Sequence, residues 1–238
     1  MNILAIIPAR GGSKGIPDKN IREFCGKPLI AYSIDCGKKS KHITRTIVST
    51  DSQKIADISI EYGAEVPFLR PLELAQDESK VVDAIVHTLE KLKSDEGYVP
   101  DYIVLLQTTS PLRLPEDIDA ALERCFEREA DAVVSLCQTE QLLYTIDNAD
   151  RLTLVSSEEF LKTTNRQQLE KTYKLDGSMV YAIKTQAFLE QKTFLPKNLV
   201  GYVIPRWRAV DLDEPEDFVV GELMMKNRKE IERSINNF

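Results

Sequence analysis

The sequence has no basic excess, few histidines and no long apolar run, and each shortage excludes a class of protein. Lys and Arg total 31 against 38 Asp and Glu, a net charge of −7. Nonspecific binding to nucleic acid or to an anionic membrane requires a basic surface and is therefore not expected. No apolar stretch approaches the ~20 residues of a membrane helix, and the apolar stretch after Met1 is too short for a signal peptide. We therefore expect a cytoplasmic protein.

Histidine and cysteine limit the chemistry further. His42 and His87 are the two histidines, so a three-histidine metal site is impossible, and neither lies near a nucleophile motif. The four cysteines show no Cys-x-x-Cys or zinc spacing, which predicts reduced and mostly buried thiols. Catalysis should therefore depend on Lys, Arg, Asp, Glu or a metal held by carboxylates.

Apolar runs and helical periodicities alternate over the first 137 residues. Strands are expected at 2–7, 46–51, 102–106 and 132–137, and helices after 28, near 55–62, over 80–93 and from 115. This alternation predicts an α/β fold, with a mostly parallel sheet covered by helices on both faces and joined by right-handed crossovers.

The pattern changes from residue 138 to about 184. Short alternating pieces and polar stretches there predict antiparallel hairpins that form a small lobe inserted into the domain. A strand-like segment over 203–212 and a closing helix over 215–235 follow. We therefore expect one domain over 1–238, with 138–184 as an inserted lobe.

The segment PARGGSKGIPDKN, residues 8–20, directly follows the first strand, where ligands of open α/β sheets bind. It combines three glycines with the cations Arg10, Lys14 and Lys19. Glycines let backbone N–H groups approach an anion, and the cations can neutralise a polyphosphate. The segment matches neither G-x-x-x-x-G-K-[ST] nor G-x-G-x-x-G. The alternative is a solvated basic turn.

Two further segments follow strands in the same way. In QTTSPLR, residues 107–113, the side chains of Gln107, Thr108 and Ser110 suit a base or a sugar, although the prolines nearby also fit an ordinary loop. In Asp211-Leu212-Asp213, two carboxylates spaced i, i+2 would share one face of a strand. Such a pair suits Mg²⁺. The alternative is that Asp213 caps the last helix.

A cationic glycine loop together with a carboxylate pair predicts phosphoryl or nucleotidyl transfer. The metal and the cations would hold a nucleoside triphosphate and neutralise the charge that develops as pyrophosphate departs.

Five motifs resemble those of the acylneuraminate cytidylyltransferase family, the CMP-sialic acid and CMP-nonulosonic acid synthetases. They are IPARGGSKGIPDKN, VSTDSQKIADISIEYGAEVPFLRP, LLQTTSPLR, the stretch from NRQQLEK to DGSMVYAI, and VDLDEPEDF. They occur in order from residue 3 to about 218. The resemblance implies a Rossmann-like fold of the nucleotide-diphospho-sugar transferase type. It also implies that CTP and a 2-keto sugar acid give a CMP-sugar and pyrophosphate.

The resemblance assigns roles to individual positions. Those implied for the triphosphate are Arg10, Lys14 and Lys19, and those implied for the nucleotide more generally also include Gly11, Ser13, Asn20, Arg70 and Asp77. Those implied for the sugar acid are Gln107, Arg166 and Tyr181, and those implied for Mg²⁺ are Asp211 and Asp213. Arg10, Lys19 and Asp213 would be catalytic. An arginine suits a carboxylate substrate, because its paired N–H donors match two oxygens.

The resemblance also implies a homodimer, in which the 138–184 lobe serves dimerisation and sugar binding and reaches the partner's active site. Two departures from the sialic acid members lie in the sugar-binding half: residues 141–144 replace a His-Pro segment, and Asp176 stands where asparagine is common. N-acetylneuraminic, legionaminic and pseudaminic acids therefore remain alternative substrates.

Two other functions remain open from the sequence. A glycosyltransferase of similar architecture would use Asp211 and Asp213 to hold a nucleotide-sugar, but would leave the cationic loop unexplained. A catalytically inactive sugar-nucleotide binding protein would not need both features.

Overall fold

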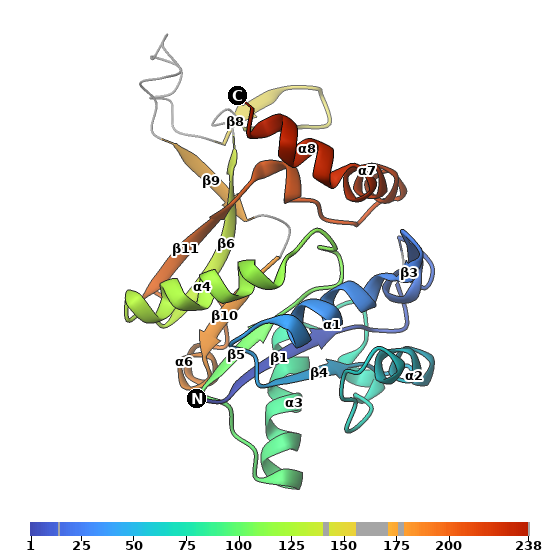
Figure 1. The fold of residues 1–238 in the computed structure, drawn as a ribbon, viewed down its shortest axis with the longest axis vertical. Coiled ribbons are helices and arrows are strands. Elements are labelled where there is room, and N and C mark those ends of the chain that lie inside the picture. The colour runs from blue at the N-terminus through green and yellow to red at the C-terminus, as the bar shows by residue number, and fades with distance from the viewer. Residues whose placement is uncertain (14, 140–142, 156–170, 176–178, 238) are drawn as a thin grey trace.

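The computed structural model describes residues 1–13, 15–139, 143–155, 171–175 and 179–237. Its centre is a seven-stranded mixed sheet with the strand order β11-β6-β10-β5-β1-β4, and β9 pairs with β6 (Figure 1). The strands of this sheet are β1 (Ile3–Pro8), β4 (Arg45–Ser49), β5 (Tyr102–Leu105), β6 (Ala132–Thr139), β9 (Thr172–Leu175), β10 (Tyr181–Lys184) and β11 (Leu199–Ile204). The β1–β4, β1–β5 and β11–β6 pairs are parallel, which confirms the expected α/β class.

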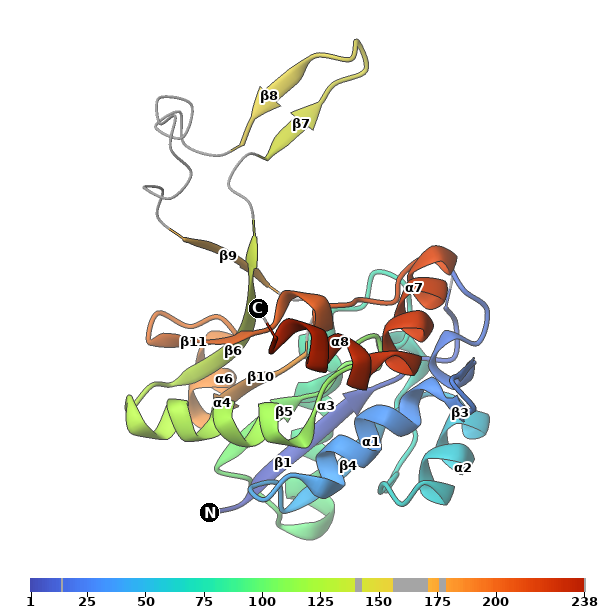
Figure 2. The same ribbon diagram turned by 45° about the horizontal axis from the view of Figure 1, so that its top comes forward.

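Helices cover both faces of this sheet, as Figures 1 and 2 show. One face packs against α1 (Leu29–Lys39), α2 (Gln53–Glu61) and α4 (Pro115–Glu127), and the other against α3 (Val81–Glu96) and α6 (Thr185–Gln191). Alternate residues of β1 supply the two cores: Ala5 and Ile7 on the first face, Leu4 and Ile6 on the second. Burial on both faces explains why the strand has an unbroken apolar sequence.

The C-terminal part packs on the N-terminal loop. The short strands β2 (Glu23–Phe24) and β3 (Lys27–Pro28) form a hairpin, and Phe24 contacts Phe218 of α7 (Pro215–Lys226) edge to face. The prediction of one closing helix is wrong, because α8 (Arg228–Ile235) begins after a break at Asn227. Both the backbone N–H and the side-chain amide of Asn227 donate to the Leu223 carbonyl, at 3.1 and 2.8 Å, at the end of α7.

The boundary predicted for the small lobe is partly wrong. β10 lies in the middle of the main sheet, antiparallel to both β5 and β6, although it was predicted to belong to the lobe. Val180, Ala182 and Ile183 are all fully buried, so this run is an interior strand and not an alternating surface strand. The part described outside the main sheet is a separate hairpin, β7 (Tyr144–Ile146) with β8 (Leu152–Leu154), which projects from the body in Figure 2.

The strand predicted over 203–212 is also shorter than expected. β11 ends at Ile204, Pro205 follows without an N–H to donate, and Arg206–Arg208 form a 3₁₀ turn. Asp211 and Asp213 therefore lie in irregular backbone, so the i, i+2 argument for their shared direction does not apply. Leu212 still packs inward between them and is fully buried.

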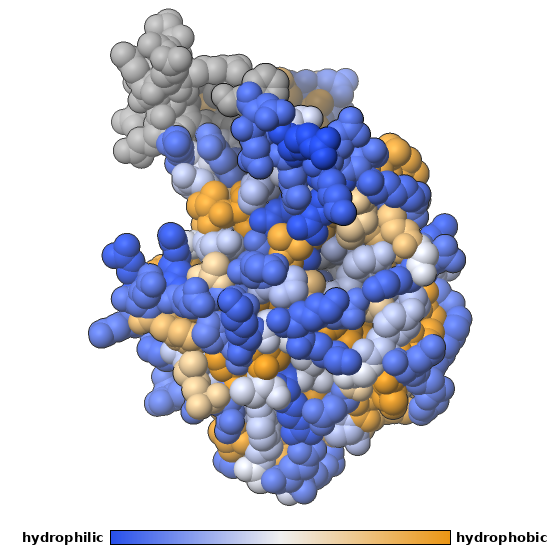
Figure 3. Space-filling model, viewed as in Figure 1, coloured by the Kyte–Doolittle hydropathy of each residue, from blue (hydrophilic) through white to orange (hydrophobic). Residues whose placement is uncertain are grey.

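The described surface is largely polar. Hydrophilic residues cover most of the face seen in Figure 3, with smaller hydrophobic patches between them. None of the helices in the described part of the chain is long and apolar enough to cross a membrane. Cys36, Cys125 and Cys137 are buried, Cys25 is half-buried, and none of the four forms a disulfide, which confirms the prediction of reduced, mostly buried thiols.

Candidate active site

Three loops begin at one edge of the sheet. The strands β5, β1 and β4 are parallel neighbours, so their carboxyl ends lie together. The Ala9 N–H donates to the Ser49 carbonyl at 2.9 Å, and the Leu106 N–H donates to the Ile6 carbonyl at 3.1 Å. The loops that follow these strands therefore start from a fixed relative position, at the edge where ligands of such sheets bind.

The structure brings the three predicted segments together at this edge. The Asn20 Nδ2 donates to the Arg10 carbonyl at 2.9 Å, and the Thr108 hydroxyl donates to Asn20 Oδ1 at 2.6 Å. The Leu212 N–H donates to the Thr109 carbonyl at 2.9 Å. The buried Asn20 side chain thus joins the first segment to the second, and a backbone bond joins the second to the third.

A pocket of ≈ 240 Å³ opens between the first two of these segments and residues 70–81. Its lining comprises Pro8, Arg10, Asn20, Arg70, Leu74, Gln76, Asp77, Ser79, Lys80, Val81, Gln107, Thr108 and Thr109. Five of the residues that the sequence assigned to substrates are in this set, while Gln76, Ser79 and Lys80 were missed. These three lie close after Leu74, in a stretch with no strand before it to mark it as a site.

Arg10 is anchored at the mouth of this pocket. Its Nη1 lies 2.9 Å from Asp77 Oδ1 and donates to the Gln76 carbonyl at 3.0 Å. Both side chains of the ion pair are about one-third exposed, so the pair is screened and weak. The guanidinium can therefore exchange its partners for a phosphate without a large loss of stability.

Lys19 contacts one of the predicted metal ligands. Its Nζ lies 2.9 Å from Asp213 Oδ1, and the Asp213 side chain is 65% exposed. Asp213 does not cap the last helix, since Glu214 occupies that position. The Asp217 carboxylate accepts the N–H groups of Asp213 and Glu214 at 3.0 and 2.7 Å. The capping alternative for Asp213 is therefore wrong, and its carboxylate faces Lys19.

Asp211 is the more buried of the two carboxylates. Burial raises the pKa of Asp211, and the Asp213 carboxylate raises it further. The Thr109 hydroxyl lowers that pKa, but neither Thr109 Oγ1 nor Asp211 Oδ1 completes a hydrogen bond among the described residues. A buried carboxylate oxygen without a partner beside a second carboxylate fits a hard cation.

The described residues contain no cluster of three or more Asp, Glu, His or Cys suited to a metal. Two carboxylates nevertheless suffice for Mg²⁺, which keeps waters and substrate phosphates as its other ligands. Asp211 and Asp213 are therefore compatible with a magnesium ion that binds together with a polyphosphate.

Asp51 is a site residue that the sequence reasoning missed. Its Oδ1 accepts the Gly11 N–H at 3.0 Å and lies 3.6 Å from Arg70 Nη2. The Gly11 amide, assigned to the triphosphate from sequence, is thus bonded to a carboxylate here. Asp51 comes two residues after β4 ends, so the signal that selected the other loops could have found it.

Burial lowers the pKa of Arg70, and the nearby Arg10 cation adds to that effect while Asp51 opposes it. The Arg70 side chain is 5% exposed, and its Nε is buried without a hydrogen bond among the described residues. A desolvated cation with a free donor on the pocket wall is suited to bind a carbonyl or anionic oxygen.

A buried arginine fixes the loop after β5. Arg113 donates to the Gln107 carbonyl at 2.6 Å, to the Ser33 hydroxyl at 3.0 Å and to the Met179 carbonyl. Gln107 therefore has a rigid backbone at the pocket wall, which leaves its side chain as the variable group.

Some predicted residues are placed elsewhere or are not described. Lys14 and Arg166 lie outside the described residues, as do Gln141 and Asp176. Ser13 is half-buried in the loop. Tyr181 belongs to β10, in register with Leu105, and its ring packs against Phe194 at 6.1 Å. Its assignment to the small lobe is wrong, and its role toward the sugar stays a prediction.

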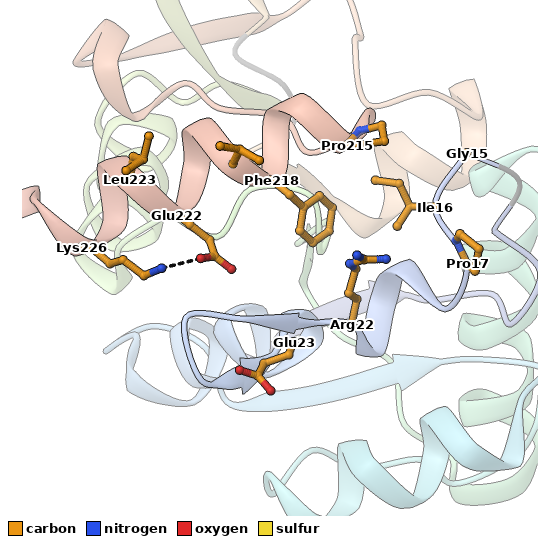
Figure 4. Close-up of a pocket in the computed structure, with 11 residues that line it drawn as sticks. Gly15, Ile16, Pro17, Arg22, Glu23, Pro215, Phe218, Glu222, Leu223 and Lys226 are labelled. Atoms are coloured by element: carbon orange, nitrogen blue, oxygen red, sulfur yellow. Dashed lines mark hydrogen bonds and ion pairs between the residues drawn. The ribbon is translucent and has the colours of Figure 1, made fainter.

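A larger hollow of ≈ 570 Å³ lies between residues 15–23 and α7 (Figure 4). Arg22 stands 5.7 Å from the centre of the Phe218 ring, and Lys226 pairs with Glu222 at 2.5 Å. Of the residues predicted for the site, none lines this hollow. The smaller pocket holds five of them, whereas Lys19, Asp211 and Asp213 line neither of these two cavities.

Cations on a glycine-rich loop, a carboxylate pair and an α/β sheet define a nucleotidyltransferase. The chain belongs to the cytidylyltransferase family, because the family model "Cytidylyltransferase" matches residues 4–208. It is 35% identical to a CMP-N,N'-diacetyllegionaminic acid synthase of Legionella pneumophila, over 97% of this chain and 99% of that protein. It is 29% identical to a pseudaminic acid cytidylyltransferase of Campylobacter jejuni, over 95% and 97%.

The fold is also similar to that of a solved nucleotidyltransferase. A structure of CMP:2-keto-3-deoxy-manno-octonic acid synthetase complexed with CTP superimposes with a TM-score of 0.70 at 15% identity, over 96% of this chain and 100% of that one. At this identity the likeness confirms the nucleotidyltransferase fold.

Proposed function

We propose that this enzyme transfers CMP from CTP to a nine-carbon 2-keto sugar acid and releases pyrophosphate. The observation that carries the proposal is that hydrogen bonds of Asn20 and Leu212 join the segments of Arg10, Lys19, Asp211 and Asp213 at one edge of the sheet. A glycosyltransferase would use the carboxylates alone and would have no need for cations that receive a triphosphate.

The cations act on the departing group. The anomeric hydroxyl of the sugar attacks the α-phosphorus, and the bond from this phosphorus to the β-phosphate oxygen breaks. Negative charge then shifts to pyrophosphate. Arg10 and Lys19 lie on the loop after β1 and can follow that charge, so their contacts strengthen in the transition state.

The carboxylates hold the cofactor. Asp211 and Asp213 would bind Mg²⁺, which when bound neutralises phosphate charge and orients the α-phosphate. Because Lys19 is paired with Asp213 in the structure, binding of the cation at Asp213 would free Lys19 for the triphosphate.

The acceptor is a nonulosonic acid. The relatives' names give legionaminic and pseudaminic acids as their substrates, and the resemblance adds N-acetylneuraminic acid. Gln107 on the pocket wall contacts the sugar, and Arg166 binds its carboxylate through paired N–H donors.

The active form is a homodimer with shared sites. The hairpin β7–β8 forms its own two-stranded sheet and exposes Leu143, Tyr144, Ile146, Leu152 and Val155. An isolated two-stranded hairpin is marginally stable in water and needs a surface to cover its apolar side. A second copy supplies that surface, and the lobe then brings Arg166 to the partner's pocket.

Release of pyrophosphate tests the proposed reaction. Incubation with CTP, Mg²⁺ and nonulosonic acids should release pyrophosphate only when an acid is present. Lys19→Ala should lower turnover at saturating CTP by about 10²–10³-fold.

Lys54→Ala is the matched control, because Lys54 pairs with Asp18 of the same loop at 2.8 Å, whereas Lys19 pairs with the predicted metal ligand Asp213. It should keep the wild-type rate. No pyrophosphate with any acid, or equal rates in the two variants, would contradict the proposal.

A further inference from the structure

We infer that Asp51 is a positioning residue of the nucleotide site. It fixes the position of the glycine-rich loop, residues 8–20, relative to the buried Arg70 side chain. This inference rests on the proposed function, because it requires that the pocket receives CTP. Asp51 touches both elements through one oxygen: Oδ1 accepts the Gly11 N–H at 3.0 Å and lies 3.6 Å from Arg70 Nη2.

The backbone around Asp51 is itself fixed. The Arg70 N–H donates to the Thr50 carbonyl at 2.7 Å, and the Ser52 N–H donates to the Thr50 hydroxyl at 3.1 Å. Thr50 is fully buried. Asp51 is therefore carried by a rigid segment, and its carboxylate has little freedom to leave its two partners.

The electrostatic arrangement makes this carboxylate necessary. Burial and the nearby Arg10 cation both lower the pKa of Arg70, and the Asp51 carboxylate opposes both effects. Arg10 already has Asp77 at 2.9 Å. Without the charge of Asp51, Arg70 would be a buried cation beside another cation, which is costly, and its guanidinium would turn away from the pocket.

The close packing at Gly11 supports the same role. A Cβ added at Gly11 would lie 3.1 Å from Ser52 Cβ and 3.5 Å from Asp51 Oδ2. The loop thus rests closely on the start of α2, and a Cβ at Gly11 would require Ser52 to shift. Asp51 determines how far the loop stands from Arg70.

Two variants separate the two contacts. Asp51→Asn keeps an oxygen for the Gly11 N–H but removes the charge opposite Arg70. It should raise KM and Kd for CTP roughly tenfold with kcat nearly unchanged, and should leave the Kd for inorganic pyrophosphate as in the wild type. Asp51→Ala removes both contacts and should weaken CTP and pyrophosphate binding alike.

A double variant tests whether Asp51 acts through Arg70. Asp51→Asn combined with Arg70→Gln should bind CTP no more weakly than Arg70→Gln alone. Asp119→Asn is the control: Asp119 is a buried carboxylate on α4 that accepts the Lys41 N–H at 2.9 Å and does not line the pocket. It should lower the melting temperature without changing CTP affinity.

The outcomes are distinct. Unchanged or tighter CTP binding by Asp51→Asn, equal loss of CTP and pyrophosphate binding in that variant, or additive effects in the double variant would overturn the inference. A wild type that binds no CTP overturns the proposed function as well. A wild type that binds CTP but turns over no acid overturns the reaction alone, and the binding results still decide the role of Asp51.

Discussion

Lys19 Nζ lies 2.9 Å from Asp213 Oδ1, so the lysine expected to bind the triphosphate is in contact with a carboxylate expected to bind the metal. The Asp213 side chain is 65% exposed, and such an ion pair contributes little to stability. The triphosphate of CTP would bind Lys19, and Mg²⁺ would bind Asp213. Their binding should therefore be mutually favourable.

Asp213→Asn separates the two roles. With a chelator present, the variant should bind CTP more tightly than the wild type, because Lys19 is free and one negative charge is gone. With Mg²⁺ present, the variant should lose most of its turnover. Its melting temperature should not change, since Asp217 caps α7.

Titration calorimetry with and without chelator measures this effect. Asp57→Asn is the control, because Asp57 is an exposed carboxylate on α2 that pairs with Gln53 at 2.7 Å. Weaker CTP binding by Asp213→Asn in chelator would contradict this account, as would full activity in excess chelator.

Gly11→Ala should destabilise the fold, and Gly12→Ala should not. A Cβ at Gly11 would lie 3.1 Å from Ser52 Cβ, whereas a Cβ at Gly12 meets no described atom within 4 Å. Crowding of this kind costs about 1–3 kcal/mol. Urea unfolding of the two variants measures the difference, and equal stabilities would refute the close contact between the loop and α2.

His87 should make stability fall at mildly acidic pH. Burial lowers the pKa of His87, with Lys91 adding to the effect, and its Nδ1 is buried without a hydrogen bond among the described residues. As pH falls through about 6.5, the unfolded chain takes up a proton that the folded chain does not, so unfolding is favoured. The lost stability returns as pH rises.

His87→Gln removes this titration. Melting temperatures of the two proteins between pH 7.5 and pH 5, roughly one unit or more on each side of the ordinary histidine pKa, should converge as pH falls. Parallel curves would show that His87 is not responsible.

Shared active sites predict recovery on subunit exchange. Arg10→Ala and Arg166→Ala should each be nearly inactive. In a mixed dimer one site lacks both arginines and the other has both intact, so an equal mixture should reach about a quarter of the wild-type rate per site. No recovery despite demonstrated exchange would place Arg166 in its own chain's site, and a monomer in solution would exclude the arrangement.

The sequence predicts those parts of the fold that local patterns determine. Pro115 begins α4 as expected, and Gly63 has the positive φ of 85° that ends the helical segment before it. The antiparallel insertion of β10 between β5 and β6 was not predictable, because pairing partners far apart in the chain leave no local pattern.

In the candidate site, too, the sequence reveals residues marked by a local pattern and not those that depend on distant contacts. Arg10 and Lys19 stand out because cations and glycines cluster directly after a strand. The Asp211–Asp213 pair was found by strand spacing, although the segment is irregular and Leu212 holds it through the Thr109 carbonyl. The position of Asp51 after β4 could have marked it as a candidate, but its contact with Arg70, 19 residues later, exists only in the folded chain.

Mass spectrometry of the reaction product tests the central claim most directly. The enzyme, CTP and Mg²⁺ are incubated with legionaminic, pseudaminic and N-acetylneuraminic acids in turn, and the CMP-containing products and pyrophosphate are quantified. The account predicts a CMP-sugar from at least one of these acids, with one pyrophosphate for each CMP-sugar formed. If none of the acids gives a CMP-sugar while the protein binds CTP and Mg²⁺, the proposed function is wrong.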